Sequence, residues 1–263
     1  MSFVEKTRFR ELWDGLLAEG TTMVGIDELV ERSGATKGGT WNAVAAATKR
    51  RLVFSPVRGL YVLVPPQYRS WGVVPADWFI ADLCAHLGRS YYVGYLSAAA
   101  YHGASHQAPQ VFQAVVDRKI AAREVEGLRL RFYQTSHFGD RATTTATGPN
   151  GPLVVATPET CALDLAEHSE RGGGLGNVAT ILSELKLDPE ALVIGATGRR
   201  PATIRRLGYL LELVSALGPW EHLRALARTD AGAPTLLHPK GGFRGPVDAR
   251  WNIQANTPVE PDE

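Results

Sequence analysis

The N-terminal part of the chain carries apolar residues at helical spacing, interrupted by glycines. Positions i, i+3, i+4, i+7 and i+8 predict an amphipathic helix; they are occupied by Phe9, Leu12, Trp13, Leu16 and Leu17. Gly20 is expected to end this helix, and a second, short helix ends at Gly34. Thr36 is placed to cap a third helix, which runs from Lys37 to about Arg50.

Two short runs rich in β-forming residues follow the third helix. Residues 52–55 and 60–63 flank a Pro-Val-Arg-Gly turn, which predicts a β-hairpin with Arg58 at its tip. Helices joined by a short glycine-containing turn and followed by a hairpin are typical of a winged helix-turn-helix. We therefore expect a winged helix-turn-helix domain over residues 1–70, ending in a proline-rich hinge at 65–77.

The second expected domain, residues 71–263, mixes strand and helix patterns. Strands are expected at 111–117, 127–135 and 152–157. Helices are expected near 78–88 and 95–102, after the Thr157-Pro158-Glu159 cap, and along the apolar stripes 175–185 and 204–214. Strands followed by helices predict an α+β fold, in which a winged helix-turn-helix precedes a mixed C-terminal domain. The tail from about residue 254 is expected to be frayed.

Composition narrows the class of protein. The 263 residues are 44% hydrophobic and 21% charged, which suits a globular chain and excludes disordered, collagenous and disulfide-rich classes. No stretch approaches the roughly 18 consecutive apolar residues of a membrane helix, and the N-terminus lacks the apolar core of a signal peptide. Cys84 and Cys161 are far apart in the sequence and are expected to be buried thiols. We expect a cytoplasmic protein that does not bind membranes.

The net charge of +1 hides an uneven distribution. No acidic residue lies between Glu31 and Asp77. The cations in this interval are Arg32, Lys37, Lys49, Arg50, Arg51, Arg58 and Arg69. Such a stretch makes a positive field that attracts a polyanion such as DNA, although a solvated basic face is an equally good explanation.

The third helix is the element expected to enter the DNA major groove. The expected DNA-binding residues are Lys37, Thr40, Trp41, Asn42, Lys49, Arg50, Arg51 and Arg58. Asn42 can bind adenine and Thr40 can contact a thymine methyl, whereas Arg58 would hold a phosphate. Two alternatives stay open: Trp41 packs in the core, or the domain serves as a protein–protein module.

Other chemical motifs are incomplete. His102 and His106 have ligand spacing, but no third ligand or zincin glutamate accompanies them. The glycine-rich segment 171–176 lacks the Gly-Lys-Ser/Thr of a P-loop, and Asp164 with Glu184 lies on predicted helices, which does not suit a magnesium nuclease. No Gly-x-Ser-x-Gly elbow is found. We therefore expect no catalytic residues, no metal, no cofactor and no enzymatic activity.

Several blocks carry a resemblance to a known family: GYLSAAAYHGASHQAP before a strand ending in VDR, TPETCALDLAEH, RGGGLGNVATILSEL, RRLGYLLEL, RWNIQAN and, in the hairpin, RGLYVL. Together they resemble the AbiEi family of antitoxins and extend from about residue 25 to 256. The resemblance implies a type IV toxin–antitoxin system. The N-terminal domain would repress the operon by binding operator DNA, for which we expect an inverted repeat. The C-terminal domain would neutralise a nucleotidyltransferase-like toxin. The third helix, which has Gly38 and Gly39 near its start, carries fewer basic residues than the recognition helices of many winged-helix proteins.

Basic residues of the second domain are further candidates for contact with the toxin or with nucleic acid: Arg129, Arg131, Arg199, Arg200, Arg205 and Arg206. The last four lie at a helix start, where cations oppose the helix dipole and an anionic partner would offset the repulsion. A solvated or internally paired patch is the alternative. Pairing with carboxylates of the same chain would remove the support for a functional role. The rival to the repressor hypothesis is a winged-helix module that binds the toxin directly, without sequence-specific DNA binding.

Overall fold

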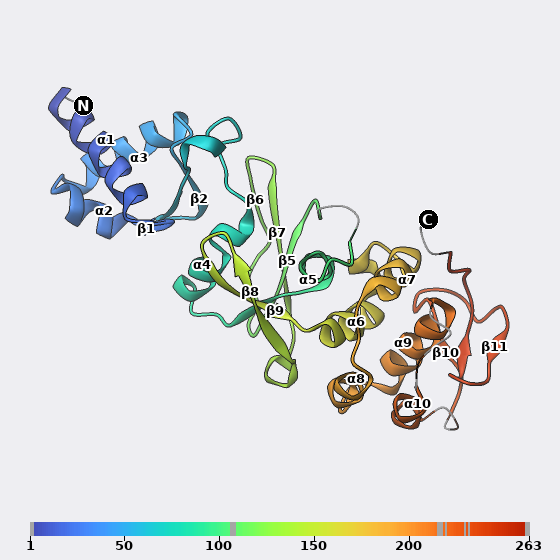
Figure 1. The fold of residues 1–263 in the computed structure, drawn as a ribbon. Helices are drawn as coiled ribbons and strands as arrows, with labels where there is room; N and C mark the ends of the chain where they lie inside the picture. The colour runs from blue at the N-terminus through green and yellow to red at the C-terminus, as the bar shows by residue number, and fades with distance from the viewer. Residues whose placement is uncertain are drawn as a thin grey trace. The chain divides into compact units, whose positions relative to one another are not determined.

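The computed structural model describes residues 3–105, 109–214, 218, 220–228, 230 and 232–260, and its fold is α+β, as the sequence predicts (Figure 1). The chain divides into two compact units. Unit 1 comprises Met1–Tyr91, Arg118–Phe132 and Thr147–Leu153; unit 2 comprises Tyr92–Asp117, Tyr133–Ala146 and Val154–Glu263. The boundary between residues 70 and 71 stays a prediction.

The first elements of unit 1 include the three helices and the hairpin that the apolar pattern predicts. They are α1 (Phe3–Ala18), β1 (Met23–Gly25), α2 (Ile26–Ser33), α3 (Lys37–Lys49), β2 (Val53–Val57) and β3 (Leu60–Leu63). Gly34 ends α2 in the left-handed conformation, with φ 58°. The Thr36 hydroxyl accepts a hydrogen bond from the Gly39 amide at 3.1 Å and caps α3.

One hydrophobic core joins these elements. The apolar face of α1 contributes Trp13 and Leu16. The other helices and strands contribute buried residues such as Leu29, Val44 and Tyr61. The sheet order is β1-β3-β2, with both pairings antiparallel. The sequence did not predict β1, because three residues are too short to show an alternating pattern. As the central strand, β3 is buried along its whole length.

The segment expected to be a hinge is packed in the rest of unit 1. It includes η1 (Pro66–Tyr68) and the start of η2 (Ala76–Trp78), and α4 (Ile80–His86) follows. Phe54 of β2 packs edge-on against Phe79 with ring centroids 5.5 Å apart. The Thr22 hydroxyl donates to Asp82 at 2.7 Å. These contacts tie the segment after β3 to the N-terminal elements within one compact unit.

A six-stranded sheet has the order β6-β7-β5-β4-β9-β8. Its strands are β4 (Tyr91–Val93), β5 (Phe112–Val116), β6 (Arg123–Val125), β7 (Leu128–Gln134), β8 (Thr143–Gly148) and β9 (Gly151–Ala156). β6 and β7 form an antiparallel hairpin, whereas β4 pairs with β9 in parallel through Val93 and Val155. The strands β5, β7 and β9 are those that the sequence predicts.

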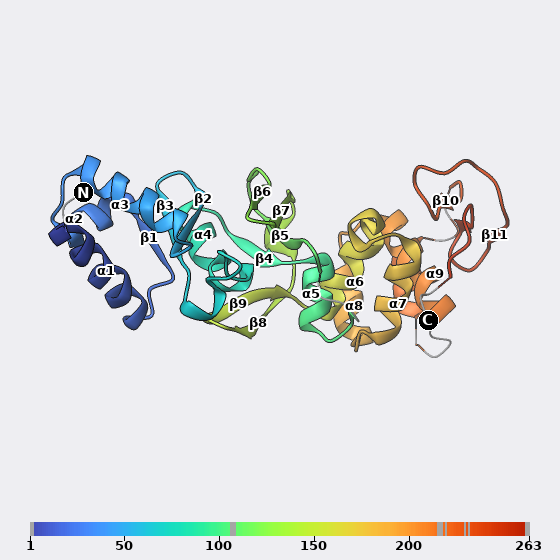
Figure 2. The same ribbon diagram turned by 90° about the horizontal axis from the view of Figure 1, so that it is seen from above.

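Helices make up most of the remainder of unit 2: α5 (Tyr95–Tyr101), α6 (Pro158–Glu167), α7 (Leu175–Glu184), α8 (Pro189–Ala196), α9 (Pro201–Val214) and α10 (Glu221–Ala227), with the short η3 (Phe138–Asp140) and η4 (Ser169–Gly172). Figure 2 shows α6, α7 and α9 side by side, and these three helices pack against one another. The Thr157 hydroxyl caps α6, and almost every residue of α6 is buried. α6 is therefore the central helix of this unit.

The C-terminal segment forms a small sheet of order β10-β12-β11, from β10 (Thr235–Leu236), β11 (Val247–Asp248) and β12 (Ile253–Gln254). Trp251 is fully buried against Gly208 of α9. The expected frayed tail from about residue 254 does not begin there. The Asn256 side chain is buried, accepts from the His238 amide at 2.9 Å and donates to the His238 carbonyl at 3.0 Å.

Two predictions from composition can be compared with the structure. Cys84 and Cys161 are buried, as expected. In the part of the chain that is described, none of the helices has the length and apolar character needed to cross a membrane.

Candidate functional site

The exposed face of α3, with the turn between β2 and β3, is the first candidate site. Seven of the eight residues expected to bind DNA are exposed here: Lys37, Trp41, Asn42, Lys49, Arg50, Arg51 and Arg58. We call these residues the α3 face. Its opposite side packs into the core through Ala43, Val44 and Ala47. α3 is therefore held rigidly while its polar residues face solvent.

Thr40 is the exception, and its expected contact with a base is corrected. Its side chain is fully buried, and its hydroxyl donates to the Thr36 carbonyl at 3.1 Å. The position lies on the core side of α3, so its methyl group cannot reach a thymine in this conformation.

Trp41 is partly packed and partly exposed. Its ring meets Tyr61 edge-on at 6.3 Å, yet 37% of the residue is exposed. Burial raises the pKa of Tyr61, and the charge of Arg58 opposes that shift.

The cations of the α3 face differ in their partners. Arg51 donates to the Ser70 carbonyl at 2.5 Å, and Lys37 lies 3.5 Å from Asp27. Arg58 is thus one of the cations that this face presents to solvent.

A polar pocket of about 290 Å³ lies within unit 2 and is the second candidate site. Side chains from β4, α5, α6, the segment 134–141 and the α8–α9 connection line it. It holds four arginines, Arg141, Arg171, Arg199 and Arg200, and we call it the arginine pocket.

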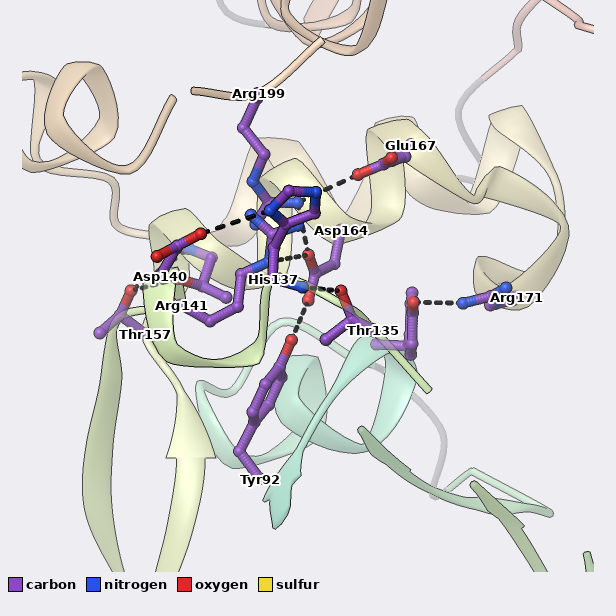
Figure 3. A network of polar contacts seen from close by, with 12 residues as sticks. Tyr92, Thr135, His137, Asp140, Arg141, Thr157, Asp164, Glu167, Arg171 and Arg199 are labelled. Carbon is purple, nitrogen blue, oxygen red and sulfur yellow. Dashed lines mark hydrogen bonds and ion pairs between the residues drawn. The ribbon is translucent and has the colours of Figure 1, made fainter. Parts of the chain in front are cut away.

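Asp164 of α6 is the centre of the polar network in this pocket (Figure 3). It accepts a hydrogen bond from the Tyr92 hydroxyl at 2.9 Å and another from Arg199 Nη1 at 2.8 Å. Arg199 also donates to Glu167 at 3.1 Å, and Arg141 Nε lies 3.9 Å from Asp164. Burial raises the pKa of Tyr92, and the Asp164 charge raises it further, so the phenol stays protonated as a donor.

Arg171 is held by aromatic rings on the other side of the pocket. Its guanidinium lies 4.2 Å from the centre of the Tyr133 ring and 5.1 Å from that of Tyr95, and it donates to the Tyr95 hydroxyl. Tyr95 has φ 52°, a conformation that a bulky residue rarely adopts. The neighbouring His168 has a lowered pKa, chiefly because of burial and also because of the Arg171 charge. His168 is therefore predominantly neutral at pH 7.

The structure corrects two of the arginines expected to contact a toxin or nucleic acid. Arg199 is buried and paired with Asp164 and Glu167 of its own chain, the arrangement that removes the support for an external contact. Arg205 is buried and donates to the Ala227 carbonyl at 3.0 Å. These two side chains hold the C-terminal helices together.

The other arginines of that set differ in exposure. Arg206 is partly buried, and its Nε donates to the Leu236 carbonyl at 2.9 Å. Arg129 is exposed and lies 3.6 Å from Glu124, while Arg131 is partly exposed. Arg200 is exposed at the pocket.

The arginine pocket has no recognisable pattern in the sequence. Tyr92 and Arg141 belong to no motif, and Asp164 was considered only as a magnesium ligand. A weak signal did exist, since an acid within the apolar face of a predicted helix needs a partner when it is buried. Of the two histidines at ligand spacing, His102 hydrogen-bonds the Ala156 carbonyl at 2.7 Å, and His106 lies outside the described residues.

Comparisons with known proteins bear on the fold of the chain and on the family of residues 92–213. No curated protein matches the sequence. The crystal structure of the RV2827C protein from Mycobacterium tuberculosis has a TM-score of 0.69 at 16% identity, covering 94% of this chain and 90% of that chain, so the fold is shared. The crystal structure of an antigenic nucleotidyltransferase-like protein from Paracoccidioides brasiliensis aligns over 57% of this chain and 91% of that chain at 11% identity. Its TM-score of 0.33 is too low to indicate a shared fold. Residues 92–213 match the family model described as the AbiEi antitoxin C-terminal domain. The resemblance found in the sequence is therefore confirmed, and this chain carries an AbiEi antitoxin domain.

Proposed function

We propose that this protein is the antitoxin of a type IV toxin–antitoxin pair. It neutralises a nucleotidyltransferase-like toxin through the domain at residues 92–213 and represses its own operon through the N-terminal elements. The observation that carries the proposal is the match of residues 92–213 to the AbiEi antitoxin C-terminal domain. The α3 face, which lies outside that match, supports the DNA-binding half.

The order and packing of the N-terminal elements support a winged helix-turn-helix. α2 and α3 pack together across the short turn at Gly34, and the β2–β3 hairpin follows α3. In this arrangement α3 is the recognition helix and the hairpin is the wing. The domain assignment to residues 1–70 forms part of the proposal.

The exposed residues of α3 suit a helix that lies in the major groove. Asn42 and Lys49, seven residues apart, lie on the same exposed side of α3, and the neighbouring Trp41 is exposed as well. An asparagine side chain can make two hydrogen bonds to adenine, which gives Asn42 the reading role. Lys37 starts the helix, and its ion pair with Asp27 is exposed on both sides, so it exchanges readily for a phosphate.

Arg58 and Arg50 supply the expected phosphate contacts. Arg58 is exposed in the turn between β2 and β3, and Arg50 is exposed at the C-terminal end of α3. Contacts with phosphates position a protein on DNA but read no sequence. Removing Arg58 should therefore weaken the binding of all sequences alike, whereas removing Asn42 should relax specificity.

The proposal is tested by a gel-shift assay with the full chain, its own upstream DNA and a scrambled competitor. We expect specific binding that falls steeply with salt, because neutralised phosphates release counterions. Arg58→Ala should reduce the slope of log affinity against log salt by about 1, and Asn42→Ala should bring the operator closer to scrambled DNA. Lys240→Ala, an exposed cation of the C-terminal segment, is the matched control and should change neither.

Equal affinity for upstream and scrambled DNA would contradict the repressor half. The alternative, a winged-helix module that binds the toxin directly, would then be the better explanation. In that case Trp41 and Arg58 variants should weaken a pull-down of the toxin instead of the gel shift. The toxin-neutralising half would remain open to its own test.

A further inference from the structure

The arginine pocket has properties that neither DNA recognition nor the proposed antitoxin role uses. Its volume of about 290 Å³ is at the lower end of small-ligand sites, and its walls are mostly polar side chains. Four arginines face three carboxylates, Asp140, Asp164 and Glu167. The arginines therefore outnumber the carboxylates of the lining by one, which favours an anion over a cation or an apolar molecule.

Arg141 is the first group that points to a ligand. Its side chain is only 10% exposed, and its Nε makes no hydrogen bond within the described part of the chain. The nearest carboxylate oxygen, on Asp164, is 3.9 Å away, too far for a hydrogen bond. Asp164 is already engaged by Tyr92 and Arg199. A buried guanidinium with an unused donor beside a pocket is a site for an external acceptor.

Arg171 and Arg200 provide two more guanidinium groups. Tyr133 and Tyr95 hold Arg171 by ring contacts, which fixes the plane of its donors. Arg200 is exposed where the α8–α9 connection borders the pocket, and its guanidinium pairs with no carboxylate among the described residues. Arg141 directly follows η3, Arg171 belongs to η4 and Arg200 lies in the α8–α9 connection. The three arginines therefore approach the pocket from different elements.

We propose that the arginine pocket binds the phosphate group of a small phosphomonoester. A phosphate monoester has three acceptor oxygens and a charge near −2. Several guanidinium groups can therefore bind it at once, whereas a single carboxylate offers fewer acceptors and half the charge. The hydroxyls of Thr135 and Ser136 line the same pocket and can donate to the remaining oxygens. The volume leaves room for the phosphate and a small polar group such as a sugar.

His168 provides a spectroscopic readout inside the pocket. Burial and the Arg171 charge lower its pKa, while Glu167 and Glu170 act in the opposite direction. A phosphate dianion near Arg171 would offset the guanidinium charge, so binding should raise the pKa of His168. A purely structural role of the arginines would give no such response to added phosphate.

The test is calorimetric titration of the full chain at low ionic strength, with inorganic phosphate, ribose 5-phosphate, ribose and glutarate as probes. We expect the two phosphates to bind and ribose and glutarate not to bind. Arg200→Ala, an exposed position that should fold normally, should weaken phosphate binding about tenfold, the effect of one charge-assisted hydrogen bond. Arg171→Lys keeps the charge but loses the planar fork and should weaken it several-fold. Arg244→Ala, an exposed arginine outside the pocket, is the matched control.

The probes also separate the two sources of the phosphate group. Equal affinity for inorganic phosphate and ribose 5-phosphate means that the group alone is recognised, and a preference for ribose 5-phosphate means that the sugar adds contacts; both support the proposal. It is overturned if neither phosphate binds, if glutarate binds equally well, or if Arg200→Ala binds phosphate as tightly as Arg244→Ala does. The result does not depend on the gel shift, because the α3 face lies outside the pocket.

Discussion

The buried ion pair of Arg199 allows a quantitative prediction about stability. Arg199 lies after α8, and its guanidinium joins Asp164 and Glu167 of α6 at 2.8 Å and 3.1 Å. The exposed fractions of the Arg199 and Asp164 side chains are 2% and 6%. Replacing Arg199 by alanine would leave the Asp164 carboxylate in the protein interior without its principal counter-ion.

The expected loss follows from this burial. Removing one partner of a buried pair costs about 3–5 kcal/mol, since the remaining charge is desolvated and uncompensated. Tyr92 would still donate a hydrogen bond to Asp164, so we expect the lower end, about 3 kcal/mol of unfolding free energy. Arg250 makes a similar 3.1 Å contact with Glu212, but its side chain is 61% exposed. Arg250→Ala should therefore cost only about 0–1 kcal/mol.

Urea unfolding of the full chain, followed by circular dichroism and by tryptophan fluorescence, measures both variants. Coincident transitions and an unchanged m-value would justify a direct comparison of midpoints. The double variant Arg199→Met/Asp164→Leu should recover much of the lost stability, because it removes the buried charge instead of exposing it. A cost below about 1 kcal/mol for Arg199→Ala, equal to that of Arg250→Ala, would refute the role of burial.

Three further predictions concern packing, capping and reactivity. Gly208→Ala should lower the free energy of unfolding by at least about 1–3 kcal/mol, because an added Cβ would lie 2.2 Å from the Trp251 ring. Gly38→Ala should raise it by about 0.5–1 kcal/mol, because an added Cβ would meet nothing within 4 Å. Thermal unfolding compares the two variants. Thr36→Ala removes the cap of α3 and should cost about 1 kcal/mol in urea unfolding, and no loss would argue against the cap. Burial raises the pKa of the Cys161 thiol, so a thiol reagent at pH 8 should label it only in urea, and rapid labelling of the native chain would contradict its burial.

Periodicity predicted the longer elements because each buries one face. The stripe from Phe9 to Leu17 became α1, and the Thr157 cap marked the start of α6. Short strands such as β1 and β10 escaped prediction, since two or three residues show no period and their pairing depends on distant strands. The C-terminal sheet escaped for the same reason, although Trp251 closes the core over Gly208.

Charge in the sequence indicated where cations gather but not which of them face solvent. Lys37 and Arg58 lie on the α3 face, whereas Arg199 and Arg205, equally prominent in the sequence, are buried and satisfied within the chain. The distinction depends on partners such as Asp164, which lies 35 residues before Arg199 in the chain. Only the fold brings such pairs together, and the arginine pocket formed by them has no linear motif.

The central claim is that the chain acts as an antitoxin, and a growth assay tests it most directly. The full chain is co-expressed with the product of the neighbouring gene, where the proposal places a nucleotidyltransferase-like toxin. Separately inducible promoters keep any repression of the native operon out of the assay. We predict that induction of the neighbouring protein alone stops growth and that co-expression of this chain restores it. Growth arrest that persists despite soluble, folded chain at equal or higher level would contradict the claim.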